Sequence, residues 1–315
     1  MQLLLHQSAR VALWMVLAVP AAAQTGMPAQ AAPPGRIEVT DEVGRRISVS
    51  LPVRRIVSLA PNLTETIYAL GAEDRLVGVT DYCDYPPEAR QKARVGGAVN
   101  PSIEQIVALK PDLVLAQAVS MNRRETVDAL ERLGIPVYSA NSNSVEGILA
   151  STRHIAELIG ASERSAELLK NLRARLDEMK RRLDGRPARR VLFVVWIDPL
   201  VTVGRQTFIA DALRLAGAES VAETDQDWPR FSLEEVVRLQ PEFLIFADSH
   251  SETVRTTVED LSTRPGWRGL DALRNRRIAI ISDAINRPAP RLIEALEELA
   301  RQLHPDAFAD KQVPR

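Results

Sequence analysis

Cysteine is nearly absent from this chain, because Cys83 is the only one among 315 residues. A single thiol cannot form an internal disulfide, so the fold must be held together by its apolar core. A metal site made of several thiolates is excluded for the same reason. A chain of this length can bury a sufficient core, and it suits two domains of ordinary size.

The chain also has no excess of charge of either sign. Lys and Arg number 40 against 41 Asp and Glu, which gives a formal net charge of −1. A nucleic-acid-binding protein usually carries a basic excess, so we expect no nucleic-acid partner. With 45% hydrophobic and 26% charged residues, the composition is that of a globular protein.

Recognisable catalytic motifs are missing from the sequence. The histidines beyond residue 10 are His154, His250 and His304, which are scattered and lack the H-x-x-H or H-E-x-x-H spacing of metal sites. There is no G-x-S-x-G nucleophile motif, no P-loop and no G-x-G-x-x-G after a strand. We therefore expect neither an enzyme nor a resident metal or cofactor.

The N-terminus predicts export. Arg10 precedes an apolar run over residues 11–19, and the small residues Ala21-Ala22-Ala23 follow it. This pattern is typical of a secretory signal peptide, here residues 1–23, and the run is too short to span a bilayer. Residues 24–35 are rich in Ala, Pro and Gln and predict a flexible leader. We expect a periplasmic protein, with a membrane anchor as the alternative reading of the same run.

Strands and helices alternate in two stretches of the chain. Residues 36–160 and 187–315 each show short β-branched runs separated by capped helices, which predicts two α/β lobes with parallel, Rossmann-like sheets. Between them, in residues 161–186, leucines recur at helical spacing and predict a helix from about residue 162 to 183, roughly 33 Å long at 1.5 Å per residue. We expect a rigid connecting helix there, and an ordinary surface helix is the alternative.

An internal repeat relates the two stretches. Residues 102–113 and 232–243 share a serine, an apolar helix, a Pro stop and an apolar strand. Two shorter pairs of similar segments occur in the same order along the two stretches. Residues 71–73 match residues 217–219, and residues 84–86 match residues 227–229. Two similar lobes would form a cleft between them, where ligands are favoured.

Three aromatic residues stand out as candidates for ligand binding. Aromatic residues make up only 4% of the chain, yet Tyr82, Tyr85 and Trp228 all lie in loops near prolines, after predicted strands. Such loops lie at the ligand-binding edge of an open parallel sheet. The alternative is that each ring packs on its own lobe.

Glu104 and Glu234 occupy equivalent positions in the repeat. Each lies in the first turn of a helix that begins after a serine, where a carboxylate favours the helix dipole. Two equivalent exposed carboxylates could also bind arginines of a partner protein. The residues alone leave both readings open.

The chain resembles the helical-backbone class, class III, of periplasmic binding proteins, which serve ABC importers of cobalamin, haem and iron-siderophores. The resemblance runs from residue 36 to residue 303. It is carried by the first strand and helix, I-V-S-L-A-P-N-L-T-E over residues 56–65, and by the element L-K-P-D-L-V over residues 109–114.

Within this class the chain is most similar to cobalamin-binding proteins. Residues 78–87 resemble their cleft loop, residues 227–229 resemble the tryptophan loop of the opposite lobe, and Arg287 matches an arginine near the ligand. The resemblance implies that Glu104 and Glu234 bind arginines of the membrane permease. The chain departs from the pattern of the cobalamin-binding proteins at two places. They often carry a tryptophan near residues 97–98, where this chain has none, and they carry an aromatic pair where this chain has Ala284-Ile285.

Together these observations predict a monomer that captures a small-molecule corrinoid, cobalamin, between Tyr85 and Trp228. Tyr82 and Arg287 complete the predicted ligand site, and no catalytic residue or cofactor is expected. The protein would deliver its ligand to an ABC permease and ATPase complex at the inner membrane. A haem-binding or ferric-siderophore-binding protein of the same class is the alternative. A stiff connecting helix further predicts a small closure on binding.

Overall fold

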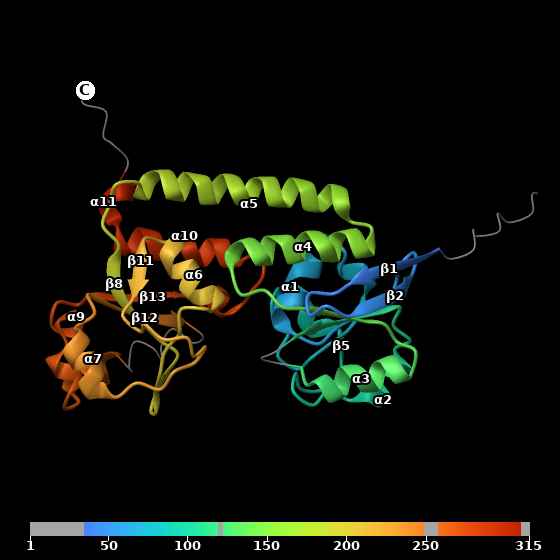
Figure 1. The fold of residues 1–315 in the computed structure, drawn as a ribbon, viewed down its shortest axis with the longest axis horizontal. Helices are drawn as coiled ribbons and strands as arrows, with labels where there is room; N and C mark the ends of the chain where they lie inside the picture. The colour runs from blue at the N-terminus through green and yellow to red at the C-terminus, as the bar shows by residue number, and fades with distance from the viewer. Residues whose placement is uncertain (1–34, 119–121, 249–257, 310–315) are drawn as a thin grey trace, which may run out of the picture. The chain divides into compact units, whose positions relative to one another are not determined.

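A computed structural model describes residues 35–118, 122–248 and 258–309, and these belong to one compact unit. The predicted signal peptide, nearly all of the predicted leader and His250 lie outside the described residues. Two parallel sheets, each from a separate stretch of the chain, organise the unit (Figure 1). The predicted α/β class with two parallel sheets is therefore confirmed. No helix of the described part has the length and apolar character needed to cross a membrane.

The first sheet has five parallel strands in the order β5-β4-β3-β6-β7. In chain order they are β3 (Ile56–Ser58), β4 (Leu76–Val79), β5 (Ala93–Arg94), β6 (Leu113–Gln117) and β7 (Val137–Ala140). A separate antiparallel hairpin precedes it, formed by β1 (Arg36–Thr40) and β2 (Arg46–Ser50). The alternating apolar residues of this segment predict the hairpin, and the structure confirms it.

Helices cover both faces of the first sheet. They are α1 (Pro61–Ala69), α2 (Ile103–Ala108), α3 (Arg124–Arg132) and α4 (Val145–Ile159). Strand β6 shows why, because Leu113 and Leu115 pack in the core with α1 and α4, whereas Val114 and Ala116 pack in the core with α2 and α3. Side chains on a strand alternate between faces, so an unbroken apolar strand needs a helical layer on each side.

The second sheet has four parallel strands in the order β11-β8-β12-β13. In chain order they are β8 (Arg189–Val194), β11 (Ala218–Ser220), β12 (Phe243–Asp248) and β13 (Ile278–Ser282). Its two faces hold separate cores: α6 (Phe208–Leu215) and α10 (Leu292–Leu303) lie on one, and α7 (Leu233–Leu239) and α9 (Asp271–Arg274) on the other. Further short elements are the antiparallel pair β9 (Trp196–Ile197) and β10 (Leu200–Val201) and the helix α11 (Pro305–Phe308). Four 3-10 turns also occur, η1 (Glu73–Arg75), η2 (Pro87–Gln91), η3 (Trp267–Gly269) and η4 (Asp283–Asn286).

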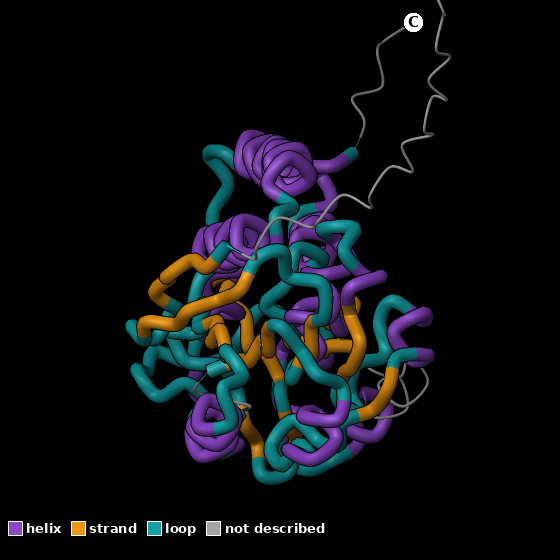
Figure 2. Tube along the Cα trace, turned by 90° about the vertical axis from the view of Figure 1, so that its right-hand side faces the viewer, coloured by secondary structure: helices purple, strands orange, loops and turns teal. Residues whose placement is uncertain are grey.

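Two helices, not one, lie between the sheets along the chain. The predicted long helix is α5 (Ser162–Leu183), which packs on α4 and α10 and lies outermost in both views (Figures 1 and 2). The preceding helix α4 contributes Val145, Ile148 and Leu149 to the core of the second sheet, and its last turns, from Ile155, to the core of the first. The chain therefore passes from one core to the other within α4. The lobe boundaries at residues 160 and 187 stay a prediction.

The internal repeat is visible in the backbone. Ser102 and Ser232 each accept a hydrogen bond from the amide three residues on, at 3.2 and 3.1 Å, and so cap α2 and α7. Both helices end in a non-glycine residue with positive φ directly before a proline, Lys110 (φ 47°) and Gln240 (φ 43°). Left-handed backbone is uncommon outside glycine, so its recurrence at equivalent positions supports a structural repeat and not only a repeat of capped-helix sequence.

Candidate functional site

The first sheet with its helices and loops is here called the first sheet region, and the second sheet with its helices and loops the second sheet region. A cavity of about 530 Å³ is lined by residues of both regions. The first region supplies loops that follow strands β3, β4, β6 and β7, and the second supplies the loops before α6 and α7 and after β13. The carboxyl ends of parallel strands are where ligands bind in open α/β sheets. The lining residues are Pro61, Asn62, Tyr82, Gln117, Ala118, Asn141, Ser142, Asn143, Gln206, Thr207, Phe208, Asp227, Trp228, Asn286, Arg287 and Pro288.

Three of the four ligand-binding residues predicted from the sequence line this cavity. Tyr82 and Trp228 come from opposite sheet regions, and their side chains are 64% and 45% exposed. Arg287 lies in the same wall as Asn286, at the end of η4. Exposed rings of this size cover apolar parts of a ligand without losing a core contact.

Tyr85, the fourth predicted residue, is not among the residues that line the cavity. The guanidinium carbon of Arg291 lies 3.8 Å from the centre of its ring, so one face of Tyr85 stacks on a cation. The clamp of a ligand between Tyr85 and Trp228 stays a prediction, and the aromatic residues that line the cavity are Tyr82, Phe208 and Trp228. A ligand contact by the exposed part of Tyr85 stays a prediction.

The stack on Tyr85 belongs to a cluster of charges that joins the two sheet regions. Glu65 of α1 accepts two hydrogen bonds from Arg291, at 2.9 and 3.0 Å, and the two side chains are only 3% and 14% exposed. Asp283 lies 3.6 Å from Arg291. Burial raises the pKa of Glu65 above its ordinary value, although the hydrogen bonds and charge of Arg291 act in the opposite direction.

Arg287 carries the positive charge of the cavity wall, and two carboxylates already neutralise it. Its Nη2 lies 3.4 Å from Asp84 and 3.6 Å from Asp283. Its Nη1 is buried and has no hydrogen-bond partner among the described residues. Asp227 also lines the cavity, so the lining residues that the structure describes carry no net positive charge.

Sequence reasoning missed a set of carboxamides in the lining. They come from both sheet regions and are Asn62, Gln117, Asn141, Asn143, Gln206 and Asn286. Asn62 donates to the Oε1 of Gln117 at 2.9 Å, which links the start of α1 to the end of β6. The signal was present, because Gln117 ends β6 and Asn141 directly follows β7, and parallel sheets place their binding groups at these strand ends.

Glu104 and Glu234, predicted to bind a permease, are both exposed at the starts of α2 and α7. Neither forms an ion pair with another side chain of the described residues. Figure 1 shows α2 and α7 on the side of the unit opposite to α5. The geometry is thus compatible with both the capping role and the docking role that the sequence leaves open.

Neither of the two histidines that the structure describes lines the cavity. His304 is buried, and its Nε2 lies 2.9 Å from the carbonyl oxygen of Gly217. His154 is exposed on α4. Within the part of the chain that the structure describes, no group of three or more His, Cys, Asp or Glu side chains is placed to hold a metal ion.

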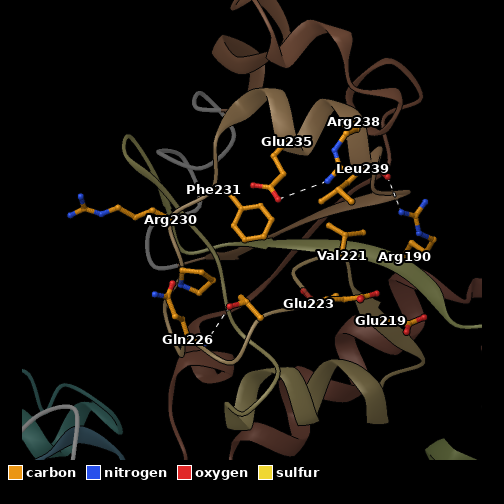
Figure 3. A pocket seen from close by; sticks show the side chains of 13 residues that line it. Arg190, Glu219, Val221, Glu223, Gln226, Arg230, Phe231, Glu235, Arg238 and Leu239 are labelled. Carbon is orange, nitrogen blue, oxygen red and sulfur yellow. Dashed lines mark hydrogen bonds and ion pairs between the residues drawn. The ribbon is translucent and has the colours of Figure 1, made fainter.

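A second cavity, of about 500 Å³, lies beside the edge strand β11 and helix α7 (Figure 3). Its walls are charged: Arg238 lies 3.9 Å from Glu235, and Arg190 donates to the carbonyl oxygen of Leu239 at 2.8 Å. All of its lining residues come from the second sheet region, and none is a predicted ligand-binding residue. Figure 3 shows Arg230 extending away from the other side chains of this cavity.

Comparison with known proteins defines the class. Residues 56–284 match the family model described as periplasmic binding protein, and the chain belongs to this family. With its two parallel sheets and its solved neighbours, it is a class III periplasmic binding protein of the ABC-transporter type. Members of this family bind a transported ligand, and the protein needs no cofactor for that task.

Individual relatives and solved structures are similar to most of the chain. The chain is 30% identical to the ABC transporter substrate-binding lipoprotein YvrC of Bacillus subtilis over 87% of each chain, and 30% identical to the vitamin B12-binding protein of Vibrio parahaemolyticus over 79% of this chain and 88% of that one. Among solved structures, the periplasmic vitamin B12-binding protein BtuF of Vibrio cholerae matches with a TM-score of 0.69 and 26% identity, over 82% of this chain and 99% of that one. The periplasmic heme-binding protein RhuT of Roseiflexus sp. RS-1 matches with 0.72 and 27%, over 81% and 99%.

Proposed function

We propose that this protein captures cobalamin in the cavity between its two sheet regions and delivers it to an ABC importer. The observation that carries the proposal is the lining of the cavity, which combines two exposed aromatic rings with six carboxamides and no net positive charge. The proposal agrees with the names of two relatives, the vitamin B12-binding proteins of Vibrio parahaemolyticus and Vibrio cholerae.

The carboxamides suit the periphery of a corrin ring. Cobalamin carries neutral amide side chains around its ring, and each offers an N–H donor and a carbonyl acceptor. Asn and Gln side chains offer the same two groups, so they can pair with ligand amides in either orientation. The rings of Tyr82 and Trp228 are suited to cover apolar parts of the macrocycle.

The charge of the cavity disfavours anionic ligands. Haem carries two propionates and ferric siderophores are commonly anionic, so burying either would require cationic partners. Among the described residues, Arg287 is the only cationic side chain in the lining, and Asp84 and Asp283 already compete for it. Haem remains the second candidate, because the phenol of Tyr82 lies in the lining and RhuT is a heme-binding neighbour.

Delivery follows from the class of protein. We assign the permease contacts to Glu104 and Glu234, whose exposed carboxylates at equivalent helix starts suit arginines of a membrane partner. The export signal predicted in residues 1–23 supports the periplasm as the compartment of this event, where the protein would act by binding and not by catalysis.

Ligand retention tests the proposal. Purified protein is mixed separately with cyanocobalamin, haemin and a ferric catecholate siderophore, each sample is desalted, and the absorbance that elutes with protein is recorded. We expect the corrinoid spectrum alone to be retained. Retention of haemin without cobalamin would refute the proposed ligand.

Replacing Trp228 tests the site in the same assay. Trp228→Ala should weaken cobalamin binding by about tenfold or more, because a large ring leaves the cavity wall. Leu133→Ala is the matched control, since Leu133 is a large apolar residue that is 57% exposed at the end of α3 and outside the cavity lining. Equal affinities for the Trp228 variant and the control would show that Trp228 does not contact the ligand.

A further inference from the structure

Trp196 is an exposed aromatic residue that the proposed site does not explain. The described part of the chain has four exposed aromatic side chains, and Tyr82 and Trp228 line the cavity while Tyr85 stacks on Arg291. Trp196 is the most exposed of the four, at 65%. Its indole N–H donates to the carbonyl oxygen of Asp198 at 2.9 Å, so the hairpin satisfies its polar edge and leaves the faces of the ring open.

The hairpin that carries Trp196 is joined to the loop that carries Trp228. Trp196 of β9 pairs directly with Val201 of β10 in an antiparallel register, and Val201 pairs in turn with Arg230. Directly paired residues of antiparallel strands project to the same face, with Cβ atoms about 5 Å apart. Trp196, Val201 and Arg230 therefore form one row across three adjacent segments.

The same register extends to the cavity. The amide of Thr202 donates to the carbonyl oxygen of Pro229 at 3.1 Å and the amide of Gly204 to that of Asp227 at 2.9 Å, which continues the pairing to Asp227, three residues before Arg230. Trp228 lies two residues before Arg230, within the segment that pairs with residues 201–204. The loop that carries Trp228 at the cavity is thus joined, through Arg230 and Val201, to the hairpin that carries Trp196.

Cobalamin is too large to be buried by the cavity alone. A cavity of about 530 Å³ is of the size that buries a drug-sized molecule, and cobalamin is considerably larger than that. The amide-bearing ring matches the carboxamide lining, so the nucleotide tail is the part that remains outside. The tail ends in a flat aromatic base, which suits the open face of an indole.

We propose that Trp196 is a second aromatic contact for the ligand, which binds the nucleotide tail where it projects from the cavity and so makes the protein prefer complete corrinoids. This inference rests on the proposed function. It assigns the row Trp196, Val201 and Arg230 as an extension of the binding surface beyond the cavity.

Calorimetric titration with two corrinoids tests the inference. Cyanocobalamin and dicyanocobinamide, which lacks the nucleotide tail, are each titrated into the wild-type protein and the variants Trp196→Ala, Trp196→Phe and Leu133→Ala. We expect Trp196→Ala to weaken cobalamin binding about tenfold and cobinamide binding by less than about threefold. Trp196→Phe keeps an aromatic face and should stay close to wild type, as should Leu133→Ala.

The outcomes separate the inference from the proposed function. Wild-type protein that binds neither corrinoid refutes the proposed function and the inference with it. Wild-type protein that binds cobalamin while Trp196→Ala binds it equally well refutes the inference alone, and so does an equal loss for cobalamin and cobinamide. Intact cobalamin binding with lost uptake by Trp196→Ala would assign this residue to the permease and also overturn the inference.

Discussion

At the scale of single residues, the carboxylate of Glu65 is the most unusual group in the unit. It is almost completely buried, and it meets Arg291, which follows η4 in the chain, in a two-bond ion pair. Burial outweighs this pairing and raises the pKa of Glu65. The unfolded chain therefore binds fewer protons at this site than the folded chain does, around and above pH 4.5.

This pKa shift predicts the sign of a pH effect. Because the folded pKa of Glu65 is raised, its contribution to stability is complete below pH 4.5 and is lost as the pH rises through the folded pKa. The free energy of unfolding of the wild type, relative to Glu65→Gln, should thus fall as the pH rises from 4 to 7. Urea unfolding of both proteins at several pH values measures the difference.

Glu297 offers a control of opposite sign. It also forms a two-bond pair, with Arg175 at 2.8 and 3.0 Å, but the two side chains are more exposed, at 18% and 36%. The hydrogen bond from Arg175 lowers the pKa of Glu297. Stability relative to Glu297→Gln should therefore rise as the pH increases toward 4.5. The same slope for both variants would contradict the assignment of burial as the cause.

The sequence predicted the position of the candidate site better than its chemistry. Tyr82, Trp228 and Arg287 are predictable because they follow strands or match family motifs, and the structure brings them to one cavity. The position of Tyr85 was not predictable, because its stack on Arg291 joins residues more than 200 positions apart. The carboxamides were passed over for a similar reason, since single Asn and Gln residues in loops are common and gain meaning only when the fold gathers them.

At the scale of elements, strong local signals predicted the fold and weak ones did not. Capped helices such as α2 and α7 begin at the expected serines, and the apolar strands β6 and β12 follow the expected prolines. The pair β9–β10 has two residues in each strand and was not predicted. Such short strands have no periodicity of their own, and their register depends on the loop around Trp228.

The two equivalent helix starts carry a prediction about transport. Glu104→Arg with Glu234→Arg should leave cobalamin affinity unchanged and abolish uptake in cells, because both carboxylates lie outside the cavity lining and would repel arginines of the permease. Uptake of labelled cobalamin and calorimetry on the purified variant measure the two effects. Glu167→Arg, on the exposed face of α5, is the control. Normal uptake by the double variant would refute the docking role.

At the scale of the whole unit, three connections between the two cores resist bending. Helix α4 contributes side chains to both cores, α5 packs along α4 and α10, and the Glu65–Arg291 pair joins the two regions beside the cavity. A hinge motion would have to break a packed helix face or separate a buried ion pair. Both cost free energy, because the first exposes packed apolar surface to water and the second separates two paired charges.

A stiff frame predicts little movement on ligand binding. X-ray scattering with and without saturating cobalamin should show radii of gyration that differ by less than about 1 Å, as expected for partners that are already organised. Arg291→Met removes the ion pair and should allow a larger difference. A clear compaction of the wild-type protein on binding would contradict this account of the frame.

Helix α4 also limits how such a protein can be divided. Its first turns pack against one sheet and its last turns against the other, so a cut anywhere between the sheets deprives one half of part of its apolar wall. Neither half is then a self-sufficient module, despite the repeat that relates them. Changes of ligand preference in this architecture are therefore expected to arise from exchange of the loops at the strand ends, and not from recombination of whole halves.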